Sequence, residues 1–183
     1  MLKVISIIAV VLVLAVIILI VVAMQKPDNF HIQRGIVIKA PAEKIFPHIN
    51  DLNAWRAWSP YEKKDPAMKR TMSGPPVGKG AAYAWDGNKN VGTGRMEITE
   101  SAPPSKVVFK LDFIKPFEGH NVATFVLTPR GSGAEAETEV IWALDGPAPL
   151  ITKVMSTVFD MDKMVGTDFG DGLASLKALA EKN

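Results

Sequence analysis

The sequence contains no cysteine. The chain therefore cannot form disulfides, bind a metal ion through thiolates or use a cysteine nucleophile. The absence leaves the compartment open, because proteins without disulfides occur on both sides of a membrane.

The sequence also has no large excess of positive or negative charge. The chain has 21 Lys and Arg against 19 Asp and Glu, a net charge of +2, and no run of basic residues. A nucleic-acid-binding surface would need a basic patch or stripe. We therefore expect no nucleic-acid partner.

Motifs for metal, phosphate or nucleophilic chemistry are absent as well. The histidines His31, His48 and His120 show no paired spacing, and Asp160-Met161-Asp162 lacks the later ligands of a calcium loop. Gly92-Thr93-Gly94 lacks the third glycine of a dinucleotide fingerprint, and no Gly-x-Ser-x-Gly elbow occurs. We expect no metal and no cofactor.

The chain does contain one long apolar run, from Val4 to Met24, in which only Ser6 is polar. As a helix it would span roughly 30 Å, the thickness of a bilayer core. The run exceeds the apolar core of about 7–15 residues in a cleaved signal, although Val21-Val22-Ala23 offers small residues for cleavage. We expect residues 1–25 to form a single-pass transmembrane anchor, with residues 4–24 in the bilayer, and residues 26–183 to form one soluble domain.

The side of the membrane on which that domain lies stays open. Lys3 precedes the apolar run, whereas Lys26, Arg34, Lys39 and Lys44 follow it. Basic residues after the run favour a cytoplasmic domain, but a short tail before a long apolar run is typical of a signal-anchor. Cleavage after residues 21–23 would instead release a free secreted domain.

Hydrophobic periodicity predicts mixed secondary structure after a short linker at residues 27–29. We expect a strand over residues 30–38, followed by short helices over residues 42–50 and 53–58. Alternating segments separated by turn residues predict further strands over 69–73, 80–85, 91–100, 106–113, 121–128 and 136–144. Short connections between these strands indicate an antiparallel meander with one apolar face.

The spacing of apolar residues changes near the C-terminus. From Ile151 to Leu176 apolar residues recur at helical spacing, which predicts a single long helix of about 30 residues. Gly166, Gly170 and Gly172 lie within it, and each costs roughly 0.5–1 kcal/mol relative to alanine. Close approach to the sheet, or a bend around a cavity, would account for them. The element order predicts an α+β domain in which a curved antiparallel sheet surrounds the C-terminal helix.

The inward-facing positions of these elements are rich in aromatic residues. An ordinary filled core would explain them, and so would a cavity for an apolar ligand, which aromatic and methionine side chains commonly line. Among polar residues, His120, Asn121 and Tyr83 are candidates for acid–base chemistry. The candidate cavity residues are Trp55, Trp58, Tyr83, Trp85, Phe109, Phe113, Asn121, Phe125, Trp142, Met155 and Phe159.

Several segments carry a family resemblance. Residues 38–46 (Ile-Lys-Ala-Pro-Ala-Glu-Lys-Ile-Phe), 55–60 (Trp-Arg-Ala-Trp-Ser-Pro), 92–100, 111–117 and 159–164 resemble the polyketide cyclase/dehydrase and lipid transport branch of the START-like (SRPBCC) superfamily. The resemblance implies a helix-grip fold with a hydrophobic ligand held between sheet and long helix. It implies no shared catalytic residues, because no catalytic motif matches positions here.

Three functions are compatible with these observations. The first is binding or transport of a hydrophobic small molecule or lipid beside the membrane. The alternative is a polyketide cyclase or dehydratase-type enzyme that uses the same cavity. The third is a structural interaction domain with a filled core.

Overall fold

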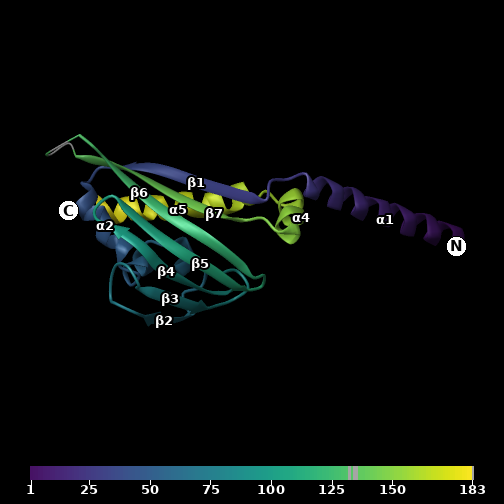
Figure 1. Ribbon diagram of the computed structural model, residues 1–183, viewed down its shortest axis with the longest axis horizontal. Helices are drawn as coiled ribbons and strands as arrows, with labels where there is room; N and C mark the ends of the chain where they lie inside the picture. Colours follow the sequence, from purple (N-terminus) through teal and green to yellow (C-terminus); the bar gives the residue numbers. More distant parts are fainter. Residues whose placement is uncertain (132, 134–135, 183) are drawn as a thin grey trace.

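The computed structural model describes residues 1–131, 133 and 136–182 (Figure 1). Its helices are α1 (Leu2–Met24), α2 (Ala42–Asn50), the 3-10 turn η1 (Ala54–Ala57), α3 (Pro60–Lys64), α4 (Leu150–Val158) and α5 (Met161–Ala180). Its strands are β1 (Asn29–Ile38), β2 (Lys69–Ser73), β3 (Ala82–Asp86), β4 (Thr93–Ala102), β5 (Lys106–Lys115), β6 (Gly119–Arg130) and β7 (Glu137–Pro147).

The strands that the structure describes form one antiparallel sheet in the order β1-β7-β6-β5-β4-β3-β2. Strands β2 to β7 follow one another as a meander, and β1 closes the other edge by pairing with β7. Side chains alternate between faces, so cross-strand neighbours such as Ile32 and Leu144 both point to the buried face. The predicted α+β fold with a curved antiparallel sheet and one apolar face is confirmed.

The predicted single C-terminal helix is wrong, because the chain forms two helices there. Phe159 is extended and Asp160 caps α5 by accepting a hydrogen bond from the Lys163 amide at 2.9 Å. A side chain that bonds to the backbone of the next turn starts a new helix. The apolar spacing continues across the break, which is why periodicity alone predicted one helix.

Helix α5 lies along one face of the sheet (Figure 1). Its residues Phe169, Leu173 and Leu176 are buried in the core. Two of its glycines lie at close approaches. A Cβ atom at Gly172 would lie 2.9 Å from the Trp142 ring, and one at Gly166 would overlap the Arg34 guanidinium. A Cβ atom at Gly170 would meet nothing within 4 Å, so close packing explains only the other two.

Helix α1 extends away from the sheet (Figure 1). Residues Lys3–Met24 contain an 18-residue window with a mean hydropathy of 3.7 and are long and apolar enough to cross a membrane, a test that a signal sequence near the N-terminus also passes. The C-terminal turns of α1 contact α4, where Ala23 is fully buried. The ammonium group of Lys26 donates hydrogen bonds to the carbonyl and hydroxyl oxygens of Ser156.

Candidate functional site

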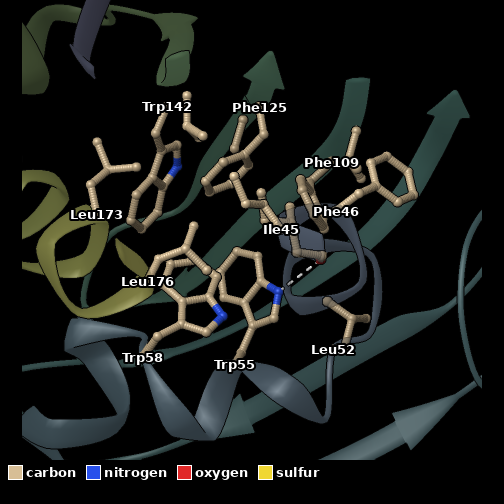
Figure 2. Packing of buried hydrophobic residues seen from close by; sticks show 14 of the residues in the cluster. Ile45, Phe46, Leu52, Trp55, Trp58, Phe109, Phe125, Trp142, Leu173 and Leu176 are labelled. Carbon is tan, nitrogen blue, oxygen red and sulfur yellow. Dashed lines mark hydrogen bonds between the residues drawn. The ribbon is translucent and has the colours of Figure 1, made fainter. Parts of the chain in front are cut away.

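The aromatic side chains beneath α5 are packed against one another (Figure 2). The ring centroids of Trp55 and Trp58 lie 4.8 Å apart, those of Trp55 and Phe109 lie 5.3 Å apart, and those of Phe125 and Trp142 lie 4.9 Å apart. These rings come from η1, β5, β6 and β7, and together they fill the space where α5 crosses the sheet. Five of the candidate cavity residues therefore form a packed aromatic cluster in this structure.

The indole nitrogens of this aromatic cluster differ in their surroundings. Trp55 donates to the Ile49 carbonyl at 3.0 Å and Trp58 donates to the His48 carbonyl at 2.9 Å, which attaches η1 to α2. The Trp142 nitrogen is buried and has no hydrogen-bond partner within the described residues. A buried donor without an acceptor is destabilising, so Trp142 places one uncompensated polar atom in the core.

A second aromatic group lies toward the β2 edge of the sheet. Tyr83 and Trp85 stack with ring centroids 6.1 Å apart, and the ring of the partly buried Phe113 meets Trp85 at 5.8 Å. The Trp85 nitrogen donates to the Val91 carbonyl at 3.0 Å. The three residues thus continue the aromatic wall of the buried face.

A buried polar network, which the sequence analysis missed, surrounds Tyr83. Tyr83 donates to Glu62 Oε1 at 2.7 Å, and Arg70 Nε donates to Glu62 Oε2 at 2.8 Å. Burial raises the pKa of Tyr83, and the bond to Glu62 raises this pKa further. Both oxygens of Glu62 are thus satisfied and its charge is paired, so the network joins α3 to β2 and β3. No short sequence pattern indicates it, because its members lie in separate elements.

The pair His120-Asn121 divides between the two faces of β6. His120 is exposed, and its Nδ1 lies 2.7 Å from Asp112 Oδ1, which raises the pKa of the imidazole. Asn121 is buried on the inner face against Gly146, where an added Cβ atom would lie 1.9 Å from Asn121 Oδ1. The inward residue is thus an amide, which does not ionise and cannot act as a base.

A cavity of about 690 Å³ lies where α1, the start of β1, α4 and the break before α5 meet. Phe159 lines it, although the sequence analysis placed this residue with the inward-facing aromatics; the helix break leaves the side chain 56% exposed. Met155 is partly buried on α4. The apolar lining comes from Pro27, Phe30, Ile32, Ala148, Val158, Phe159 and Met161, and the polar lining from Lys26, Asn29, His31, Thr152, Lys153, Ser156, Thr157, Asp160 and Asp162.

Two charged side chains that line this cavity, Lys153 and Asp162, form ion pairs. Lys153 is largely buried and contacts Asp28 at 2.6 Å, a hydrogen bond that lowers the pKa of the Asp28 carboxyl. Arg34 contacts Asp162 at 2.8 Å, and this hydrogen bond lowers the pKa of that carboxyl. Among the described residues, no group of three His, Cys, Asp or Glu side chains is placed to hold a metal ion. The cavity thus has a lining of both apolar and polar side chains.

His31 lines the cavity and is paired with Asp145. Its Nδ1 is 2.6 Å from Asp145 Oδ1, and this bond, followed by one to Gln33, raises the pKa of the imidazole. The two residues face each other across the β1–β7 register. The sequence separates them by more than a hundred positions, so spacing alone did not indicate the pair.

The fold is shared with solved structures. A protein from Thermobifida fusca is 17% identical with a TM-score of 0.61, and the match covers 82% of this chain and 92% of that one. The Aha1 dimer from Colwellia psychrerythraea is 19% identical with a TM-score of 0.56, covering 83% of this chain and 96% of that one. DynU16, from the dynemicin biosynthetic locus, is 16% identical with a TM-score of 0.56, covering 86% of this chain but 48% of that one.

At these identities the structural matches show a common fold and no more. Comparison with curated proteins yields no match. The family described as polyketide cyclase / dehydrase and lipid transport matches residues 29–181, which is most of the chain and the whole of the sheet with its C-terminal helices. The chain therefore belongs to the polyketide cyclase / dehydrase and lipid transport family.

Proposed function

We propose that this protein is anchored in a membrane by residues 1–25 and binds a lipid-like molecule through its helix-grip domain, residues 26–183. The binding site in this proposal is the cavity at the end of α1. One observation carries the proposal: Lys26, the second residue after a helix apolar enough to span a bilayer, lines that cavity.

The size of the cavity supports a small-molecule ligand, and its lining of both polar and apolar side chains suits an amphipathic one. Small-molecule sites occupy about 300–1,000 Å³. The volume of about 690 Å³ falls in that range. An amphipathic molecule would place its chain against Phe30, Ile32 and Phe159, and its polar end near the Lys26 and Ser156 side chains.

Lipid binding can be tested on the full chain in phosphatidylcholine nanodiscs that contain a diazirine-labelled lipid. We expect crosslinks in the segment 30–32, which forms the β1 wall of the cavity. Thr152→Trp should occupy part of the cavity and reduce these crosslinks roughly tenfold, equivalent to about 1.4 kcal/mol of binding free energy. Peptide mass spectrometry gives the position and yield of each crosslink.

The matched control is Thr71→Trp, which adds the same side chain to an exposed position on β2 outside the cavity. This variant should crosslink like the wild type. Equal crosslinking of segment 30–32 in both variants would contradict the proposed site. The anchor is tested separately, because an intact N-terminus by mass spectrometry and resistance to alkaline extraction are expected only if residues 1–25 are retained in the bilayer.

A second candidate function is enzymatic, a cyclase or dehydratase reaction in the same cavity. The pairing of His31 with Asp145 favours it, since a carboxylate that orients an imidazole is a recurrent arrangement for acid–base catalysis. This function would require His31, so His31→Ala should abolish turnover of a cyclase or dehydratase substrate, whereas the binding function alone predicts no turnover in the wild type.

The His31–Asp145 pair also predicts a pH dependence. Because the pKa of His31 is raised in the folded chain, the interaction stabilises the fold fully below the unfolded value of about 6.5 and is lost as the pH rises through the raised pKa. Asp145→Asn should return the pKa toward 6.5. A histidine-selective NMR titration measures this, and unchanged titration in Asp145→Asn would show that the pair does not form.

A further inference from the structure

We infer that α4 lies in the headgroup layer of the bilayer, with its apolar stripe against the lipid chains. We define the stripe as Leu150, Ile151, Val154 and Val158, of which Val158 also lines the cavity. This inference rests on the proposed membrane-spanning role of α1. It adds a second contact with the bilayer and a fixed position for the cavity relative to the lipid.

Helix α4 exposes the apolar face that a soluble protein would bury. At helical spacing the four stripe residues fall on one side of α4, because residues four apart lie one above the other. Leu150 is 50% exposed, Ile151 is 48% exposed and Val158 is 58% exposed. Lys153, on the opposite side, is buried.

The polar side of α4 is already occupied. Thr152, Lys153, Ser156 and Thr157 line the cavity, Ser156 accepts a hydrogen bond from Lys26, and Lys153 pairs with Asp28. The helix therefore cannot turn its apolar stripe inward without breaking these contacts. Val154 is half-buried between the three exposed members of the stripe, and an exposed apolar surface of this kind marks an interaction site.

The position of α4 along α1 identifies the occupant as lipid. Helix α4 packs on the end of α1, where Ala23 is fully buried and Lys26 binds Ser156. At about 1.5 Å per residue, Lys26 lies only about 3 Å beyond the end of the apolar run at Met24. Amphipathic helices of the bilayer interface bury their apolar face to about 5–10 Å at this same boundary.

The absence of native cysteine makes a direct test possible with single nitroxide labels. The full chain would be labelled at Leu150→Cys or Ile151→Cys, two exposed stripe positions outside the cavity lining, in nanodiscs of phosphatidylcholine and phosphatidylglycerol. Both positions should lose accessibility to a water-soluble nickel reagent while oxygen, which concentrates in lipid, still reaches the label. Met72→Cys, an exposed apolar position on β2, is the matched control and should remain accessible to nickel.

A label at Val13→Cys, in the middle of α1, separates the two proposals. If this label is shielded from nickel but both α4 labels are accessible, the anchor stands and the interfacial position of α4 is overturned. If the Val13→Cys label is also accessible to nickel, both proposals fail. If the α4 labels are shielded from oxygen and nickel alike, the stripe packs against protein, which also overturns the lipid assignment.

Discussion

Glu62→Ala should lower the free energy of unfolding by about 3–5 kcal/mol, the usual cost of removing one partner from a buried ion pair. Glu62 is buried, and its two carboxylate oxygens accept hydrogen bonds from Tyr83 and Arg70. Its removal leaves the Arg70 charge without its buried carboxylate partner and the Tyr83 hydroxyl without its acceptor. Denaturant unfolding of the full chain in detergent micelles measures the change.

The control for this prediction is an exposed ion pair. Arg95 contacts Glu97 at 2.7 Å, but both side chains are at least one-third exposed, so Glu97→Ala should cost no more than about 1 kcal/mol. The loss of unfolding free energy in Tyr83→Phe should fall between those of Glu62→Ala and Glu97→Ala, because this substitution removes one hydrogen bond and leaves the ion pair intact. Equal costs for Glu62→Ala and Glu97→Ala would mean that the network does not hold α3 to the sheet.

Phe169→Ala is expected to destabilise the fold by about 3–5 kcal/mol, the range for truncating a buried aromatic ring. Phe169 is 2% exposed, and its ring stacks on Trp142 with centroids 4.0 Å apart and planes 8° from parallel. It is the principal aromatic contact between α5 and the sheet. Unfolding followed by tryptophan fluorescence reports the loss directly, because Trp142 is the partner.

An identical substitution at an exposed ring provides the comparison. Phe117, in the turn between β5 and β6, is 54% exposed, so Phe117→Ala should change stability by no more than about 0.5 kcal/mol. If both substitutions had the same small effect, α5 would be held loosely and the aromatic cluster beneath it would not be a packed core.

Patterns that depend on near neighbours in the sequence were sufficient to predict the sheet. The alternation of Val107, Phe109, Leu111 and Phe113 predicted a strand over residues 106–113, and β5 spans Lys106–Lys115. Residues two positions apart point to the same face in a strand but not in a helix. Alternating apolar residues therefore predicted the strand positions and the antiparallel meander.

Features that depend on contacts across the fold were not predictable in this way. Periodicity placed Trp55, Phe125 and Trp142 on the inner face, but whether inward rings contact each other or enclose space depends on distances between elements. The network of Glu62 and Arg70 and the pairing of His31 with Asp145 were not predicted for the same reason, because they too depend on distances between elements. The break at Phe159 was missed because the apolar spacing on either side of Asp160 continues without interruption.

The connection between α1 and the sheet is short and is held by hydrogen bonds. Helix α1 ends at Met24 and β1 begins at Asn29, and between them Lys26 binds Ser156 while Asp28 accepts a hydrogen bond from the Ala148 amide at 2.7 Å. If the linker between α1 and β1 were flexible, the domain could change its orientation relative to α1 and reach a distant membrane or partner. Here any tilt of α1 would turn the sheet with it. In the membrane-anchored protein that we propose, the cavity would therefore keep a fixed orientation to the bilayer, and a molecule leaving it would be received at the bilayer surface.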